Sequence, residues 1–439
     1  MQTTLLYLSE IAKYVLAVIF CLYSITGIYS FRYQRESKRK YIASFQTILI
    51  FISQLFMFLQ IIMTSNDTGY FFYYLFIQSF LLIALTMLPL IYDSVHKVLL
   101  NHTCMLLGIG LCMISRLNQQ KAIKQYIIVI ISFMICSCIP FLLIKTKIWK
   151  KLTWFYGLFG VSILSVVLVF GEFTHGSKIS FQIGGISFQP SEFIKIVFLF
   201  FLAGALYECT SFYQVCLTAI VAGLHVIILV LSTDLGSALI FFVGYVLVVF
   251  LATGNYLYLM SGILGGGVAA YIAYTLFDHV QIRVMAWLDP WKYIDNQGFQ
   301  ITQSLFSIGC GSWFGMGLFK GNPKAIPYVD ADFIFSSICE ELGVIAGICI
   351  ICICLECFVI MMQLSTRISD RFYQIIIYGI AVMYIFQIFL TVGGGVKFIP
   401  LTGVTLPFIS YGGSSVMTSM IMFFIIQGIY IRSQQEGGR

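Results

Sequence analysis

Long apolar runs recur along the whole chain, and they constrain its fold more than any other feature. Each run is about as long as the roughly 20 residues that a helix needs to cross a bilayer. The weakest run, 98–115, has Asn101 and His102 near its start. The pattern predicts an all-α polytopic membrane protein with thirteen spans. These spans are residues 14–31, 42–64, 71–92, 98–115, 126–144, 152–170, 189–206, 214–231, 235–252, 257–277, 333–362, 372–392 and 406–431.

The composition favours lipid over water as the main solvent of this chain. Hydrophobic residues make up 60% of it and charged residues only 10%, whereas soluble domains carry about 25% charged residues. The mean hydropathy is +0.95. The net charge of +7 is modest, and no basic helix with interleaved aromatic residues occurs, so we expect no nucleic-acid partner. Most of the 13 cysteines lie in apolar runs without zinc-ligand spacing.

The distribution of basic residues predicts how the chain is oriented. The first apolar run, Tyr14–Phe31, is followed by the basic segment 32–40 and not by a small-residue cleavage site. This predicts an uncleaved span with the amino terminus outside, and the basic tail 432–439 places the carboxyl terminus inside. The predicted outside loop 116–125 fits poorly, because it carries three basic residues.

Two polar segments lie on the predicted outer side. Residues 172–188 are short and rich in glycine, and 278–332 form the longest polar stretch of the chain. Within the longer segment, residues 299–319 are half apolar and contain four glycines, which predicts broken helices at the interface. A loop of this length is more often functional than a simple linker.

Charged residues in or beside spans are candidates for function because their burial is costly. Glu192 and Lys195 are three residues apart and share a helix face, as a structural pair or as ligands of a substrate. Asp234 precedes a span, where it could cap a helix. Glu340 and Glu341 lie about two turns into the span predicted to start near Asp332.

Asp332 has two interpretations. It could cap the helix that follows, or it could be a partly desolvated general base acting on a sugar hydroxyl. Desolvation among Phe333, Ile334 and Phe335 would raise its pKa, and the helix amino terminus would lower it. Nearby cations could hold a phosphate leaving group or could be solvated loop charges. They are Arg283, Lys320, Lys324 and Lys397.

Several strings occur in an order that resembles the SEDS family (shape, elongation, division and sporulation), which includes RodA, FtsW and SpoVE. The resemblance covers about residues 150–431, and its order makes it specific. Two of the strings combine separated residues: Gly184–Gly185 with 188–192 and Lys195, and 332–335 with 340–343. The others are 233–238, 287–290, 298–300, 303–305, 308–317, 402–403 and 406–415.

The resemblance implies a domain organisation and an activity. A ten-span core would occupy 99–439, with the large outer loop between core spans 7 and 8, and about three accessory spans would occupy 1–98. The family polymerises lipid II outside the bacterial cytoplasmic membrane, in complex with a class B penicillin-binding protein. The process served would be elongation, division or sporulation. Membrane lipid would surround the spans.

The resemblance also implies an active site. Asp332 matches the essential acidic residue of the family and would take the proton of the acceptor's 4-hydroxyl, while undecaprenyl pyrophosphate leaves the donor glycan. No redox cofactor is needed. A divalent cation (Mg²⁺ or Mn²⁺) that holds the pyrophosphate is compatible with this chemistry. No metal cluster of protein ligands is predicted. Substrate contacts are expected at Glu192, Lys195, Asp234, Arg283, Gln303, Ser304, Lys324, Ser410, Tyr411 and Ser414.

Some positions depart from the family pattern. Residues 328–331, just before Asp332, replace a usual Glu, variable residue, His and Thr, and Asp330 among them could share the base role. Two other functions stay open. A lipid-linked oligosaccharide flippase would place its key charges near mid-membrane, as Glu192, Lys195 and Glu340 could do. A scaffold that has lost catalysis would explain the changes before Asp332.

Overall fold

The computed structural model describes residues 2–32, 36–65, 67–146, 148–174, 177–183, 186–208 and 210–437. Helices dominate, and twelve of them, within these residues, are long and apolar enough to cross a membrane. The predicted polytopic all-α architecture is confirmed, and the chain is a multi-pass membrane protein. Gly184 and Gly185, which belong to one of the strings above, lie outside the described residues.

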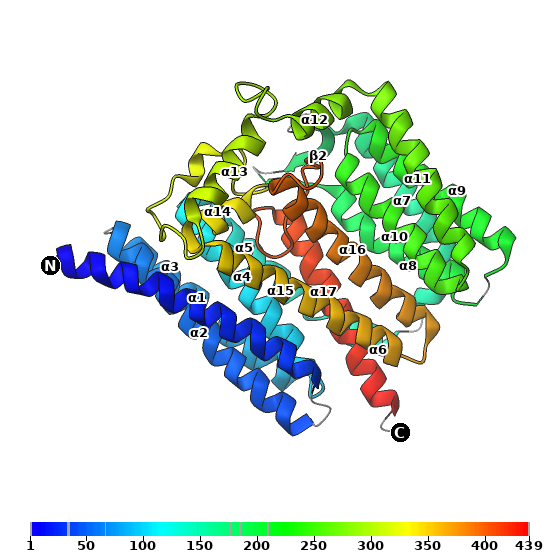
Figure 1. Cartoon of the computed structure of the whole chain (residues 1–439). Coiled ribbons are helices and arrows are strands. Elements are labelled where there is room, and N and C mark those ends of the chain that lie inside the picture. Colours follow the sequence, from blue (N-terminus) through cyan, green and yellow to red (C-terminus); the bar gives the residue numbers. More distant parts are fainter. Residues whose placement is uncertain are drawn as a thin grey trace.

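The first three helices form an accessory bundle on one flank of the molecule (Figure 1). They are α1 (Gln2–Arg32), α2 (Glu36–Ser65) and α3 (Gly69–Ile91). The core comprises α4 (Lys97–Leu117), α5 (Gln119–Cys136), α6 (Ile139–Lys145), η1 (Ile148–Leu152), α7 (Thr153–Phe170), α8 (Pro190–Leu206), α9 (Phe212–Leu231), α10 (Leu235–Thr253), α11 (Tyr256–Leu276), α12 (Asp278–Leu288), α13 (Phe299–Gly311), η2 (Pro323–Ala325), α14 (Ile334–Leu342), α15 (Val344–Arg367), α16 (Arg371–Gly395) and α17 (Gly413–Gly437).

Helix α4 is the centre of the contact between the accessory bundle and the core. It packs against α2, α3, α5 and α15, and every residue from Val98 to Leu117 is buried. Its polar side chains find partners in this interior: the Asn101 amide donates to the Ala43 carbonyl at 2.7 Å. This predicted span is therefore packed inside the protein along its whole length.

Three predicted spans are interrupted or shortened. The span 126–144 divides into α5 and α6 just before Pro140, which cannot donate a backbone hydrogen bond inside a helix. The span 333–362 divides into α14 and α15 at Gly343, whose φ of +92° favours glycine. The last span begins at Gly413 and not at 406, because the residues before it form a loop.

Backbone hydrogen bonds join the chain around Gly343 to the segment after α13. The Val344 and Ile345 amides donate to the carbonyls of Ser312 and Trp313, and the Gly317 amide donates to the Glu341 carbonyl. At the break between α14 and α15, the segment after α13 therefore packs against α14. This agrees with the expected broken helices in residues 299–319.

A small sheet is the exception to the helical prediction. Strands β1 (Glu172–Thr174), β2 (Ser177–Ile183) and β3 (Ile186–Phe188) pair antiparallel in the order β1-β2-β3. Phe181 lies opposite Phe188 in the β2–β3 pair. The sequence predicted only a short glycine-rich segment here, and the sheet brings the residues before α8 to the end of the bundle.

The two chain ends lie on opposite sides of the bundle. A hydrogen bond of 2.6 Å joins Glu10 in α1 to Lys320 in the long polar loop, so the start of α1 lies at the end of the bundle that carries this loop. Helix α17 starts at that same end and runs away from it (Figure 1).

Candidate active site

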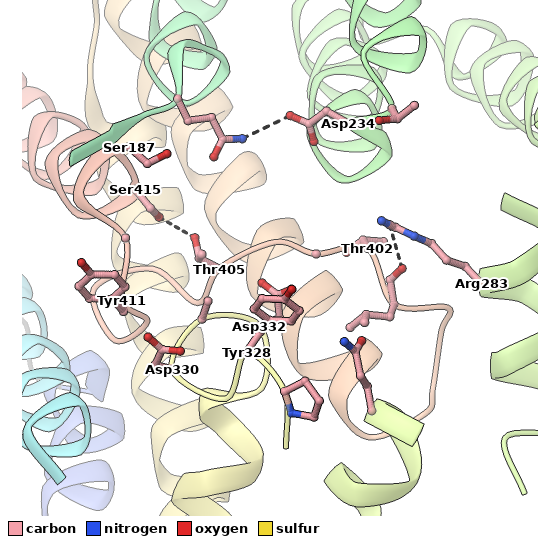
Figure 2. A pocket seen from close by; sticks show the side chains of 18 of the residues that line it. Ser187, Asp234, Arg283, Tyr328, Asp330, Asp332, Thr402, Thr405, Tyr411 and Ser415 are labelled. Atoms are coloured by element: carbon pink, nitrogen blue, oxygen red, sulfur yellow. Dashed lines mark hydrogen bonds between the residues drawn. The ribbon is translucent and has the colours of Figure 1, made fainter. Parts of the chain in front are cut away.

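A cavity of about 770 Å³ opens at the end of the bundle that carries the long polar loop. Its wall combines the first turns of α5, strand β3, helix α12, the start of α13 and two loops, 327–332 and 401–415. These segments come from distant parts of the chain, and Figure 2 shows their polar side chains around one space. Among the residues expected to act on substrate, Asp234, Arg283, Asp332, Tyr411 and Ser414 line this cavity.

Asp332 is a half-buried residue on the cavity wall, and it lies one position before the capping residue of the following helix. Helix α14 begins at Ile334, and its capping residue is Phe333, with no side-chain cap. The backbone before Asp332 turns sharply at Tyr328, which has a φ of +57°. The amide of Asp332 donates to the Tyr328 carbonyl at 3.2 Å.

The loop 406–411 clamps the segment that carries Asp332. The Ser410 hydroxyl donates to the Ala331 carbonyl at 2.6 Å, and the Tyr411 amide donates to the Asp330 carbonyl at 2.8 Å. Ser410 also accepts from the Leu406 amide. Ser410 is itself buried and is absent from the cavity wall, so it positions Asp332 through the backbone.

Asp234 serves as a helix cap and also lines the cavity. Its carboxylate accepts from the Ser237 amide at 3.1 Å and from the Ser191 hydroxyl at 3.2 Å. Gln189, another wall residue, donates to it at 3.4 Å. Loss of solvent raises the pKa of the Asp234 carboxyl, and the hydrogen bonds from Ser237 oppose this rise. The capping interpretation of Asp234 is confirmed.

Arg283 places a cation beside both acidic groups. It comes from α12 and donates to the Leu401 carbonyl at 3.2 Å. Burial lowers its pKa, and the charges of Asp332 and Asp234 oppose this shift. An arginine stays protonated under such conditions. Arg283 is therefore a positive charge on the same cavity wall as Asp332.

A second polar group lies on the other side of Asp332 in Figure 2. The Lys121 ammonium, from the first turn of α5, pairs with Asp330 at 2.5 Å and lies 5.2 Å from the centre of the Tyr411 ring. Lys124, one turn along α5, also lines the cavity. Asp330 is therefore engaged by a cation, and this pairing argues against an independent role as base.

Glu192 and Lys195 form a buried pair behind the cavity wall. Their charged groups are 2.9 Å apart, and Lys195 also donates to Gln387 at 2.9 Å. Gln387 in turn donates to the Thr405 carbonyl at 2.9 Å. These two residues were expected to bind substrate, but the cavity wall does not include them. The network supports the loop that carries Thr405, which matches the structural alternative for this pair.

Three other expected contacts also lie away from the cavity wall. Ser304 is buried and bonds Ser336 and the Gly395 carbonyl, at 2.5 and 2.7 Å. Gln303 is half-buried in α13, and Lys324 is exposed on η2. The wall includes none of these three side chains, so the structure gives no support to direct substrate contact by them.

The two glutamates of α14 bind the turn that precedes η2. Glu341 accepts from the Arg116 side chain at 2.8 Å and from the Phe319 amide at 3.0 Å. Glu340 accepts from the Asn322 amide at 2.6 Å.

The three basic residues of segment 116–125 lie in two places. Arg116 is in the buried pair with Glu341, and Lys121 and Lys124 are on the cavity wall. The sequence predicted no contact for these three residues. Their poor fit to the depletion of basic residues in outside loops was a signal that they have partners.

Comparison with known proteins identifies the family. A family model described as "Cell cycle protein", which groups FtsW, RodA and SpoVE, matches residues 94–435. The chain belongs to this family of polytopic membrane proteins, as its ordered strings predicted.

Individual relatives agree with this assignment. The peptidoglycan glycosyltransferase RodA of Mycobacterium tuberculosis is 34% identical over 279 residues, which are 58% of this chain and 58% of that protein. The chain thus matches little more than half the length of this relative. Stage V sporulation protein E of Bacillus subtilis is 32% identical over 299 residues, covering 64% of this chain and 80% of that protein.

A solved structure shares the fold. It is a chain from a peptidoglycan synthase complex that coordinates polymerisation and crosslinking, with a TM-score of 0.66 at 24% identity. The match covers 77% of this chain and 98% of the solved chain.

Proposed function

We propose that this protein is a peptidoglycan glycosyltransferase that joins lipid II units into glycan strands. The observation that carries the proposal is Asp332: it is a half-buried carboxylate on a cavity wall that it shares with the positive charge of Arg283. The family and the names of the relatives support the same activity.

The proposed reaction needs one proton acceptor and one site for negative charge. Asp332 accepts the proton of the acceptor sugar's 4-hydroxyl, and the oxygen attacks the anomeric carbon of the donor. The bond from that carbon to the pyrophosphate breaks, and its electron pair leaves with undecaprenyl pyrophosphate. Arg283 stabilises the charge that develops on this leaving group.

A divalent cation at this site would be bound mainly by oxygen atoms of the substrate. Among the described residues, no three His, Cys, Asp or Glu side chains come together as metal ligands. If Mg²⁺ or Mn²⁺ takes part, the pyrophosphate would supply most of its ligands, and Asp332 or Asp234, two of the three acidic residues of the cavity wall, would supply another. Removal of the cation by a chelator, followed by a polymerisation assay, tests this requirement.

We propose that the cavity end of the bundle faces outward from the bacterial cytoplasmic membrane. Lipid II polymerisation occurs on that face in the family, and the inside location that the charge pattern predicts for the basic tail 432–439 agrees with it. The amino terminus is then outside. A class B penicillin-binding protein is the proposed partner, because the solved chain of like fold belongs to a complex that couples polymerisation to crosslinking. Elongation, division and sporulation are the candidate processes.

The flippase alternative has less support from the charges inside the bundle. Glu192, Lys195 and Glu340 each have a polar partner within the protein, whereas a transport site presents polar groups to its cargo. The scaffold alternative must explain why an acidic residue and an arginine still face one cavity.

The test is a polymerisation assay with the full chain, its cognate transpeptidase and labelled lipid II. Glycan strands on a gel are expected from the native protein, and Asp332→Asn should reduce them by about 100-fold or more. Asp295→Asn, an exposed acid of the same loop outside the cavity wall, is the matched control and should keep full activity. Polymer formation by Asp332→Asn at the native rate would exclude the base role. Lipid scrambling in vesicles without polymer would favour the flippase.

A further inference from the structure

The cavity has a second source of positive charge at the start of α5. Lys121 and Lys124 are three residues apart, so their side chains share one helix face, and both line the cavity together with Ile128 one turn further on. Arg283 reaches the cavity from α12. In Figure 2 Arg283 and the group of Asp330 and Tyr411 lie on opposite sides of Asp332. Cations on two separate elements therefore flank the proposed base.

Lys121 is held in place by contacts that a ligand can exchange. Its ammonium pairs with Asp330 at 2.5 Å, with 42% of the lysine side chain and 14% of the aspartate side chain exposed. The lysine end of the pair is open to the cavity, so an incoming anion can reach the ammonium and compete with Asp330 for it. The Tyr411 ring, 5.2 Å from the ammonium, remains in contact with Lys121 when Asp330 leaves.

Lys124 is the less satisfied of the two lysines. Its side chain is exposed, and it makes no ion pair among the residues that the structure describes. Lysines are depleted in outer loops of membrane proteins, and Arg116, the third cation of this segment, is neutralised by Glu341. Among the three cations of this segment, Lys124 is therefore the one without an ion pair among the described residues, and Lys121 has a partner that a ligand can replace.

We propose that Lys121 and Lys124 form a second anion-binding subsite, which holds the pyrophosphate of the acceptor substrate. This inference rests on the proposed function, because joining two lipid-linked sugars brings two pyrophosphate groups to one cavity. The leaving pyrophosphate is bonded to the reacting carbon and so lies near Asp332, where Arg283 is. The acceptor reacts through its far hydroxyl, so its pyrophosphate lies further from Asp332, on the side of Lys121.

Asp330 is an internal competitor in this subsite. A pyrophosphate diester carries two negative charges, and the two lysines supply two positive charges once Asp330 turns away. Asp330 neutralises Lys121 while the subsite is empty and lowers its affinity for the acceptor. Asp330, which departs from the family pattern, thus lowers the affinity for the acceptor substrate and leaves the activity in place.

A binding titration tests the subsite without turnover. The full chain carrying Asp332→Asn is placed in neutral phosphatidylcholine nanodiscs and titrated with undecaprenyl pyrophosphate by calorimetry. Two equivalents should bind. Adding Lys121→Met and Lys124→Met should raise the dissociation constant of one of the two equivalents by about tenfold or more. Adding Asp330→Asn should instead lower the dissociation constant of that same equivalent by a few fold. Lys292→Met, an exposed loop lysine outside the cavity wall, is the control and should change neither.

Several outcomes would overturn the subsite. An unchanged titration in the double lysine variant would do so, and so would an Asp330→Asn variant that binds less tightly. Equal competition by phosphatidylglycerol would assign the lysines to a general phospholipid headgroup. Lys121→Arg should keep the native binding that Lys121→Met loses, which separates loss of charge from misfolding.

The kinetic measurement keeps the subsite and the proposed function apart. In the active chain, the double lysine variant should raise the KM for lipid II about tenfold with kcat within about threefold of native, because ground-state binding is lost. A native chain that makes no polymer would remove the proposed function, while the titration would still decide whether the lysines bind pyrophosphate.

Discussion

The Tyr23 hydroxyl in α1 lies 3.2 Å from Nδ1 of His102 in α4, so the accessory bundle and the core share a buried polar contact. The other ring nitrogen of His102 lies 3.2 Å from a carboxylate oxygen of Glu356 in α15. All three side chains are buried. The accessory helices therefore meet the core through polar groups as well as through apolar packing, and polar groups in such a setting fix one docking position.

Gly27→Leu should weaken the docking of α1. A Cβ at Gly27 would lie 1.8 Å from a Glu356 carboxylate oxygen, so the larger side chain must displace the glutamate from His102. A destabilisation of about 1–3 kcal/mol is expected, measured as a lower midpoint of thermal unfolding in detergent. Gly223→Leu, on a helix face with nothing within 4 Å of the added Cβ, should leave the midpoint unchanged. Equal midpoints for both variants would contradict the tight approach at Gly27.

Arg116→Met should destabilise the protein by about 3–5 kcal/mol, because it leaves the buried Glu341 carboxylate without its cation. Adding Glu341→Gln should recover part of this loss, since the uncompensated charge is then gone. A double-mutant cycle of unfolding free energies measures the coupling. Additive effects of the two changes would show that the pair contributes nothing as a unit.

Gly343→Ala should disturb the junction of α14 and α15. The backbone there has a φ of +92°, and an added Cβ would lie 2.4 Å from the Trp313 carbonyl oxygen. We expect about 1–3 kcal/mol of strain and a loss of polymerisation, because α14 follows Asp332 directly. Gly309→Ala, which meets nothing within 4 Å, provides the comparison in both assays. Native behaviour of Gly343→Ala would mean that the break tolerates a side chain.

Ser410→Ala should lower kcat more than it raises KM. The change removes the hydroxyl that holds the Ala331 carbonyl at 2.6 Å, next to Asp332, and it leaves that carbonyl unpaired at a cost of about 1–3 kcal/mol. Steady-state rates over a series of lipid II concentrations separate the two constants. Ser433→Ala, near the other end of α17, is the control. A pure KM effect would place Ser410 in substrate binding and not in positioning.

Local features of this fold were predictable from the sequence, and long-range pairings were not. The Glu192–Lys195 pair follows from spacing of three along one helix, and the Asp234 cap follows from its place before an apolar run. Lys121 and Asp330 are 209 residues apart, and Arg116 and Glu341 are 225 apart, so no periodicity connects them. The break at Gly343 was missed because one glycine in an apolar run is compatible with a continuous helix.

The buried position of α4 has a consequence for how the chain is made. This helix carries an asparagine, a histidine and an arginine, which would be expensive to expose to acyl chains. The three accessory helices precede it in the sequence and are therefore synthesised first. When α4 leaves the ribosome and enters the bilayer, its polar face has α2 and α3 to pack against. The accessory bundle thus gives the core its first protein surface during membrane insertion.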